Sequence, residues 1–300
     1  MKEKRQELRV HLLNVGHGCN IIIQFPDNTF GVVDCYLANK TINYLAKLSA
    51  TELQFICATH PHADHSLSIP NLMREYSGRI RQLWHCGFPH PSRTDALILK
   101  RAELDRNIVF TSFTNAFGLW CIYQRAGTQI NIGSVSLTVL SPSQRLYNQF
   151  LNYQTDINDA SIVLKLTYER SEMILGSDAL ARSWGEIMAD FPAPGELNCQ
   201  TLIVPHHGSD NGIPFGLLRQ MKPRHALISA SAQKIHSRQF PDKTTVQMLT
   251  RIGCTIYNTA DVDAEGKPKG SIVVRMNGTN RPFIERLGDA VDEHPNPPAI

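Results

Sequence analysis

The segment Thr59-His60-Pro61-His62-Ala63-Asp64-His65 places three imidazoles and a carboxylate within six residues. It follows LQFICAT, a nearly continuous apolar run of the kind that forms a strand buried on both faces. Because side chains at i and i+2 of an extended segment point the same way, His60 and His62 can bind one ion. Asp64 and His65, in the following turn, face a second position. The segment therefore predicts a metal site at the end of a buried strand.

Two further segments end in residues that can complete such a site. Asp178 follows the strand-like run MILGS, where its carboxylate can bridge two ions, cap the helix ALARSWGEIM, or do both. His206 and His207 follow TLIVP at another strand end, and the pattern does not say which of them binds metal. Mixed nitrogen and oxygen ligands without thiolate predict two divalent ions, zinc or manganese.

Candidate catalytic roles fall on the same residues. Asp64 is expected to be a metal ligand and a general base. His207, or its neighbour His206, is expected to stabilise charge on the departing oxygen. The expected output is hydrolysis, because two divalent ions held close together activate water.

The composition is that of an ordinary globular protein, with 42% hydrophobic and 19% charged residues. Thirty Lys and Arg against 27 Asp and Glu leave a net charge of +3, so no overall basic field indicates a nucleic-acid binder. No apolar run reaches the roughly 18 residues of a membrane helix, and the start MKEKRQELRV lacks the apolar core of a secretory signal. Seven cysteines without a CxxC pair suit a reducing compartment. We therefore expect a cytoplasmic protein that does not contact a membrane.

Strand and helix patterns alternate along the chain, with no linker between its halves. LRVHLLNVGHGCNIIIQF and TFGVVD predict strands joined by turns, and the second half alternates strand with helix from ARSWGEIMADF to CTIYNTA. This order predicts an α/β protein built as a single four-layer αββα sandwich over residues 1–285, with a flexible tail over 286–300. Residues 91–130 show no firm period, and we interpret them as an insertion or lid over the metal site.

These motifs resemble a known family. HPHADH resembles the HxHxDH signature of the metallo-β-lactamase fold. The order LNVGHGCNIII, VVDC, HPHADH, NDASIVLKL, MILGSDA, LIVPHHGS and ALISA resembles the ComEC-type branch, the hydrolase domain of DNA-uptake proteins, over roughly residues 9 to 276. The resemblance implies an αββα metallo-β-lactamase sandwich with a two-metal hydrolase site, which acts on phosphodiesters in many relatives.

The sequence departs from this family at three places. Many relatives read NVGQGD where this chain reads NVGHGC, which changes a polar pair near the site. The wider superfamily often has a metal-binding histidine just before the strand SIVLKL, where this chain, like its branch, has Asn-Asp. Relatives usually have His-Pro after the ISA-type strand, where this chain has Phe240-Pro241. The further candidate ligands at these places are His17, Asn158, Asp159 and His236.

Cations around the expected site are candidates for phosphate binding. Lys234, Arg238 and Lys243 flank His236. A second group brackets HCGFPH and consists of Arg79, Arg81 and Arg93. Scattered Lys and Arg are also typical of any solvated surface, so the nuclease hypothesis depends more on the resemblance than on charge.

Three functions are compatible with these observations. The first is a metal-dependent nuclease or phosphodiesterase that acts on nucleic acid, with protein partners in a DNA-processing or defence system. The second is a hydrolase of a small molecule or a phosphocholine-type ester that uses the same metals. The third is a structural or regulatory subunit with a degenerate site, a hypothesis that the missing His-Pro keeps open.

Overall fold

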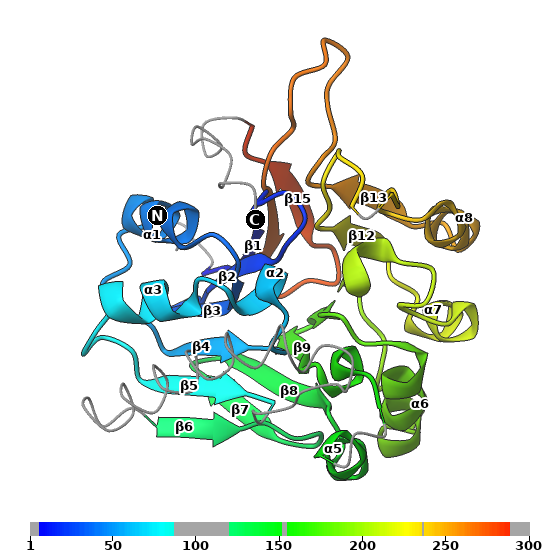
Figure 1. Cartoon of the computed structure of the whole chain (residues 1–300), viewed down its shortest axis with the longest axis horizontal. Coiled ribbons are helices and arrows are strands. Elements are labelled where there is room, and N and C mark those ends of the chain that lie inside the picture. The colour runs from blue at the N-terminus through cyan, green and yellow to red at the C-terminus, as the bar shows by residue number, and fades with distance from the viewer. Residues whose placement is uncertain (1–5, 87–119, 152–154, 236, 289–300) are drawn as a thin grey trace.

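The computed structural model describes residues 6–86, 120–151, 155–235 and 237–288, and their strands form two sheets (Figure 1). The first sheet has the order β15-β14-β1-β2-β3-β4-β5-β6, and the second has the order β13-β12-β11-β10-β9-β8-β7. The strands of the first sheet are β1 (Leu8–Leu12), β2 (Asn20–Gln24), β3 (Phe30–Cys35), β4 (Phe55–Ala58), β5 (Gln82–His85), β6 (Trp120–Tyr123), β14 (Ile272–Met276) and β15 (Phe283–Arg286). Those of the second are β7 (Gln129–Ile132), β8 (Val135–Ser141), β9 (Val163–Tyr168), β10 (Ser171–Leu175), β11 (Thr201–Ile203), β12 (His225–Ile228) and β13 (Thr255–Asn258).

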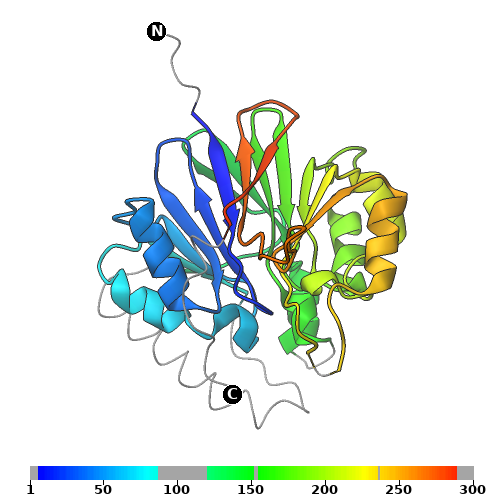
Figure 2. The same cartoon turned by 90° about the horizontal axis from the view of Figure 1, so that it is seen from above.

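Helices lie on the outer side of each sheet, so that the layers follow one another as helix, sheet, sheet and helix (Figure 2). On the first sheet lie α1 (Ala38–Lys47), α2 (Ala63–Ser66) and α3 (Ile69–Glu75). The remaining helices are α5 (Gln144–Leu151), α6 (Ala181–Asp190), α7 (Phe215–Met221) and α8 (Lys243–Arg251), with the short 3-10 helices η1 (Ile157–Ala160) and η2 (His206–Gly208). This arrangement is the predicted αββα sandwich. Within the described residues, no helix is long and apolar enough to cross a membrane.

An apolar core fills the space between the two sheets. Inward-facing side chains of both sheets contribute to it, among them Val10 of β1 and Leu166 of β9. Phe55 and Trp84, on adjacent parallel strands, stack with ring centroids 3.7 Å apart. Burial of each large apolar side chain stabilises the fold by about 1.5–3 kcal/mol. This core holds the two sheets in a fixed relation, and with them the loops at the sheet edges.

Strands of the first sheet lie at two of the expected boundaries. Phe283–Arg286 forms β15, and the amide of Leu287 donates to the carbonyl of Ser271, so the sheet continues slightly beyond the boundary expected at residue 285. As an edge strand without a fully buried face, β15 has no apolar alternation that the sequence could reveal. Within the segment 91–130 that we interpret as an insertion or lid, Trp120–Tyr123 forms β6 beside β5. The rest of both segments, 91–119 and 289–300, lies outside the described residues, and so does the expected lid.

The direction of the central strands brings several carboxyl ends to one edge of the molecule. Strands β3, β4, β5 and β6 pair in parallel in the first sheet, and β10, β11, β12 and β13 do so in the second. Side chains that follow parallel strands meet at the same sheet edge. The amide of Ile162, just before β9, donates to the carbonyl of Thr59, just after β4, which ties the two edges together.

A buried histidine outside this edge makes the fold sensitive to acid. His11 of β1 is 2% exposed, and its Nδ1 lies 2.9 Å from the hydroxyl of Tyr44 on α1. Burial lowers the pKa of His11 to about 4. The unfolded chain therefore binds this proton more readily, and stability falls as the pH drops from about 6.5 towards 4. At pH 5 the expected loss is about 2 kcal/mol from this residue.

The variant His11→Gln is expected to lose that part of the acid sensitivity, because glutamine does not titrate. Urea unfolding of both proteins at pH 7 and pH 5 measures the difference. An equal loss of unfolding free energy in the two proteins would show that His11 does not contribute.

Candidate metal centre

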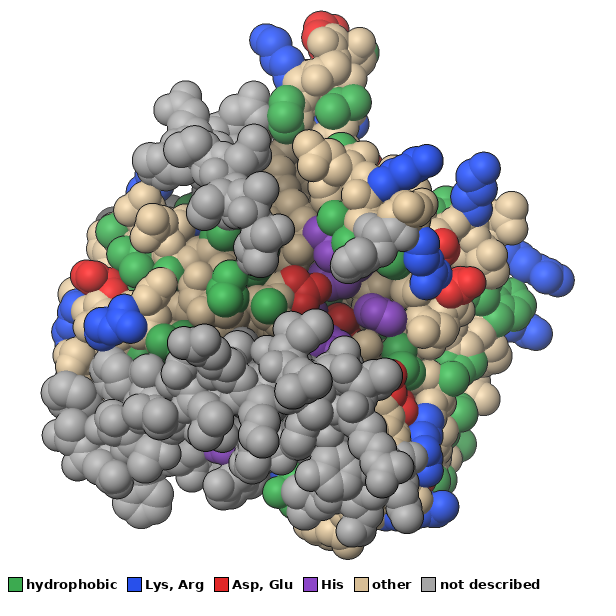
Figure 3. Space-filling view, in the orientation of Figure 1, with side chains coloured by type: hydrophobic (Ala, Val, Ile, Leu, Met, Phe, Trp, Pro, Cys, Tyr) green, Lys and Arg blue, Asp and Glu red, His purple; other side chains and the backbone are tan. Residues whose placement is uncertain are grey.

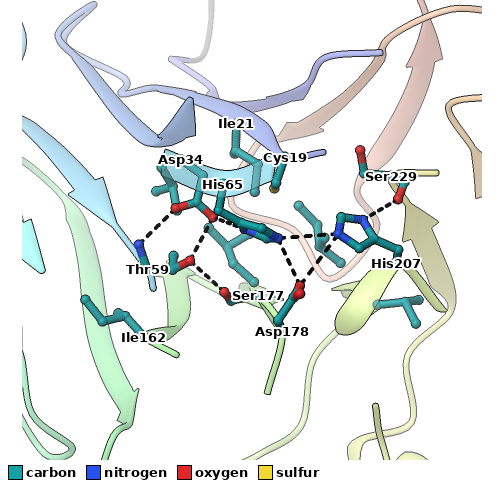
Figure 4. Close-up of a pocket in the computed structure, with 14 residues that line it drawn as sticks. Cys19, Ile21, Asp34, Thr59, His65, Ile162, Ser177, Asp178, His207 and Ser229 are labelled. Atoms are coloured by element: carbon teal, nitrogen blue, oxygen red, sulfur yellow. Dashed lines mark hydrogen bonds and ion pairs between the residues drawn. The ribbon is translucent and has the colours of Figure 1, made fainter. Parts of the chain in front are cut away.

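Six of the predicted ligands converge where the strand ends meet. His60 and His62 follow β4, Asp178 follows β10, and His207 follows β11. Helix α2 begins at Ala63, so Asp64 and His65 lie in its single turn, directly after the extended segment. Three of these side chains, His65, Asp178 and His207, line a pocket between the sheets (Figure 4). Ile21 of β2, Asp34 of β3 and Ser229, which follows β12, also line it.

One group of donors consists of His60, His62 and Asp178. Their ligand atoms all lie within 4.8 Å of one another. His60 Nε2 lies 3.2 Å from His62 Nδ1 and 3.7 Å from Asp178 Oδ2. His60 is fully buried, whereas His62 is only partly buried. This group therefore has one side towards the protein interior and one towards solvent.

A second group consists of His65, His207 and Asp178, again with all ligand atoms within 4.8 Å. His65 Nε2 lies 3.1 Å from Asp178 Oδ1 and 3.4 Å from His207 Nε2. Asp64 adds a carboxylate, with Oδ2 3.3 Å from His207 Nε2. Imidazole nitrogens that face one another beside carboxylates form a donor set that fits a divalent cation.

Asp178 belongs to both groups. Its Oδ2 is the oxygen nearest His60, and its Oδ1 is the oxygen nearest His65 and His207. The alternative role as a helix cap does not apply, because α6 begins at Ala181 with Leu180 at the N-cap position. The carboxylate thus lies between two donor groups with one oxygen towards each.

Three residues that the sequence analysis did not single out hold His65 in place. Asp34 Oδ2 accepts from His65 Nδ1 over 2.6 Å, which leaves Nε2 directed at Asp178. Asp34 in turn accepts from the amide and the hydroxyl of Thr59, and Ser177 Oγ donates to Thr59 Oγ1 over 2.7 Å (Figure 4). Partners of this kind fix the ring orientation of a metal-binding histidine. The only sequence signal for Asp34 was an acidic residue at the end of the apolar run GVVD.

The structure distinguishes His206 from His207. His207 is 5% exposed, and its Nδ1 donates to the carbonyl of Ser229 over 2.8 Å, so that Nε2 faces the donor groups. His206 is directed elsewhere, with Nδ1 2.9 Å from Asn211 Oδ1. His206 is in none of the donor groups, and its prediction as a ligand is not supported. Two adjacent residues of a tight turn project in different directions, which no periodicity reveals.

Charge and burial act against each other in this centre. Burial alone would raise the pKa of Asp178, but the positive charges of His65 and His207 lower it well below its usual range. Burial alone would lower the pKa of His65, but Asp178 and Asp34 raise it well above its usual range. His60 responds mainly to burial, which lowers its pKa and keeps it neutral. The carboxylates of the second group therefore favour a positive charge on or beside its histidines.

Four non-glycine residues at the same edge have a strained backbone. Asp34, Ser177, His206 and His207 all have φ between 46° and 59°, a region that non-glycine residues rarely adopt. Such conformations persist where surrounding contacts hold them, and they cluster at functional sites. Here, they direct Asp34 towards His65 and His207 towards Asp178.

The remaining candidate ligands have different surroundings. His17 is close to the second group: its ligand atom lies within 4.8 Å of those of Asp64 and His207. Asn158 is 7% exposed, with an Oδ1 that has no hydrogen-bond partner. Asp159 is outside the donor groups, because its carboxylate accepts from Thr155 and from Ser183 at the start of α6. His236 lies outside the described residues.

The expected phosphate-binding cations that the structure describes differ in their pairing. Arg238 is paired with Asp210 and Asp242, at 3.1 and 2.8 Å, so its charge is already compensated. Lys234 and Lys243 are exposed. Figure 3 shows histidine and acidic side chains together near the middle of this face, while the described Lys and Arg side chains are scattered around it. The second cation group is also compensated where described, since Arg79 and Arg81 pair with Glu75 and Glu52, and Arg93 lies outside the described residues.

Comparison with solved structures identifies the fold. The protein YhfI from Bacillus subtilis, described as a metallo-β-lactamase fold protein, superposes with a TM-score of 0.54 over 90% of this chain and 99% of its own, at 14% identity. This chain has the metallo-β-lactamase fold. A variant of the β-hydroxylase CmlA shares the fold, with a TM-score of 0.50 over 89% of this chain and 54% of CmlA, at 12% identity. Comparisons of the sequence with protein-family models and with curated proteins found no match.

The metallo-β-lactamase fold accounts for the position of the donor groups. They lie between the two sheets, at the edge where the carboxyl ends of β4, β10 and β11 meet. The fold thus confirms the architecture that the HPHADH segment indicated, while the assignment to the ComEC-type branch remains a hypothesis.

Proposed function

We propose that this protein is a metal-dependent hydrolase of phosphodiester bonds, with nucleic acid as the substrate and a two-ion centre as its catalytic site. The proposal combines the metallo-β-lactamase fold with the ComEC-type motifs, whose relatives include phosphodiester hydrolases. The two ions are zinc or manganese, in keeping with ligands that are imidazole nitrogen and carboxylate oxygen.

One observation carries the two-ion assignment. Asp178 directs one oxygen at His60 and the other at His65, with the Nε2 of His60 and that of His65 at 3.7 and 3.1 Å. A carboxylate in this arrangement can bind a cation on each side. In the proposed centre, the first ion is held by His60, His62 and Asp178, and the second by Asp64, His65, Asp178 and His207.

The bound ions would supply Lewis acidity and lower the pKa of a water molecule. The protein side chains provide the remaining functions. Asp64 is the one partly exposed carboxylate in the centre, with 29% of its side chain exposed, and a hydrogen bond to His207 helps to hold its pKa below the usual range despite burial. Asp64 therefore stays ionised, and we assign its carboxylate to accept a hydrogen bond from the attacking water and so orient it. His207, whose Nδ1 donates to Ser229, would act through Nε2 as the ligand that positions the second ion next to the charge that develops in the transition state.

One observation favours the second candidate function, hydrolysis of a small phosphate ester. Of the three cations that flank His236, Arg238 is already paired with two carboxylates, which weakens the contact with phosphates that a long nucleic acid would use. The degenerate-site hypothesis receives less support, because six potential ligands converge.

The two adjacent histidines offer a matched test. His207→Ala is expected to lower hydrolysis of bis(p-nitrophenyl) phosphate and of single-stranded and plasmid DNA by more than about 100-fold. Removal of a residue that only supports a metal ligand lowers activity by about 10- to 100-fold, and removal of the ligand itself should have a larger effect. His206→Ala, which removes the same side chain from the neighbouring position, should leave turnover near the wild-type value.

Assays with EDTA, Mn²⁺ and Zn²⁺ establish the metal dependence of the wild-type protein. Cleavage of the small diester without cleavage of either DNA would favour the small-ester function. Wild-type activity that EDTA does not remove, or equal activity of the two alanine variants, would contradict the proposed function.

A further inference from the structure

The imidazole of His17 lies close to the second donor group, but the proposed centre does not use it as a ligand. Its ring centroid lies 4.3 Å from that of His207 and 5.0 Å from that of Phe240. Its ligand atom lies within 4.8 Å of those of Asp64 and His207. Nδ1 of His17 is shielded from solvent and has no hydrogen-bond partner. An imidazole that has a shielded nitrogen without a partner, and a ligand atom beside a carboxylate and a second imidazole, is a candidate metal ligand.

The loop that carries His17 is fixed to the centre through the two residues that come after it, Gly18 and Cys19. The amide of Cys19 donates to the carbonyl of Asp64 over 2.9 Å. The hydroxyl of Ser229 donates to the carbonyl of Gly18 over 2.6 Å. Because the carbonyl of Ser229 also accepts from His207, one residue positions both His207 and the loop of His17.

Gly18 permits this close approach. A Cβ atom at Gly18 would lie 2.9 Å from the carbonyl oxygen of Asp64 and 2.5 Å from the ring of Tyr36. Any larger residue would force the loop away from α2. The sequence thus places a glycine where the backbone must touch the segment that bears Asp64, and this contact sets the position of His17.

We propose that His17 is an additional ligand of the second ion, together with Asp64, His65, Asp178 and His207. This inference rests on the proposed two-ion centre. It makes the second position richer in imidazole than the first, with three histidines against His60 and His62. Imidazole ligands suit zinc, copper, iron and nickel better than manganese, magnesium or calcium. Of the two metals proposed, the second position should therefore prefer zinc to manganese.

The test is a titration of metal-free protein with Co²⁺, followed by its visible absorption spectrum, which reports coordination number and ligand type without any substrate. Wild-type protein should take up two ions. His17→Ala should bind the second ion at least about 10-fold more weakly and show a changed band for that ion, since even a supporting residue contributes 10- to 100-fold to affinity. His17→Gln, which keeps a side chain of similar length, serves as the variant that disturbs the loop least and should also weaken the second ion.

His206→Ala is the matched control and should reproduce the wild-type titration and spectrum. A His17→Ala protein with the wild-type affinity and spectrum would overturn the role of His17 while leaving the proposed two-ion centre intact. The same holds if His17→Ala changes only the KM for a phosphodiester, because His17 would then contact substrate. A wild-type protein that takes up fewer than two ions would overturn the two-ion centre itself, and the role of His17 with it.

Discussion

Replacing Asp178 with alanine is expected to abolish metal-dependent hydrolysis and to release at least one ion. The carboxylate has one oxygen near His60 and the other near His65, so its removal takes a ligand and a negative charge from both positions. Without it, two cations a few ångströms apart would repel one another. Turnover should fall by at least about 100-fold, a larger effect than removal of a supporting residue.

Metal content and thermal midpoint, measured on the same preparation, separate loss of the ions from loss of the fold. Asp178 caps no helix, so the alanine variant should remain folded. Asp178→Asn keeps the side-chain volume and removes the charge, and it should fail in the same way. Asp210→Ala removes an exposed carboxylate outside the donor groups and should behave as wild type. A folded Asp178→Ala protein that keeps two ions and full turnover would contradict the bridging role.

Replacing Asp34 with alanine is expected to weaken metal binding by 10- to 100-fold and to destabilise the protein as well. Asp34 is 1% exposed and accepts from His65 Nδ1 and from Thr59, so the change leaves several buried donors without a partner. Each buried group left in this way costs about 1–3 kcal/mol. The effect on metal would arise although Asp34 is not assigned as a ligand.

Asp34→Asn separates the two consequences. The amide oxygen can still accept from Thr59 or His65, so we expect most of the stability to return, while the lost charge continues to weaken the ion beside His65. Isothermal titration with Zn²⁺ and urea unfolding measure these quantities. Asp190→Ala, at the exposed end of α6, is the control. Unchanged zinc affinity in both Asp34 variants would show that Asp34 does not position His65.

The architecture could be predicted because its strands have simple patterns. Both faces of β4 are buried, so its sequence FICA is apolar throughout. In the first part of β8, buried side chains alternate with partly exposed ones. The turn expected between NIIIQF and TFGVVD connects β2 and β3 as a hairpin. β15 was missed since an edge strand needs no apolar face.

The site was predictable where several donor residues are adjacent in sequence, as in HPHADH and VPHHGS. It was not predictable where the direction of a side chain in the fold decides whether that side chain faces the centre. The left-handed backbone at His206 and His207 sends the two rings apart. Asp34 is a single acidic residue in an apolar strand, and only the fold brings it to His65. The fold also brings Asp210 and Asp242 to Arg238, a pairing that the sequence did not indicate.

Anomalous X-ray scattering from crystals of the Mn²⁺- or Zn²⁺-loaded protein tests the two-ion centre most directly. The expected result is a pair of peaks on either side of Asp178, one beside His60 and His62 and the other beside His65 and His207. A single peak, or no peak within coordination distance of Asp178 in fully loaded crystals, would contradict the proposed centre.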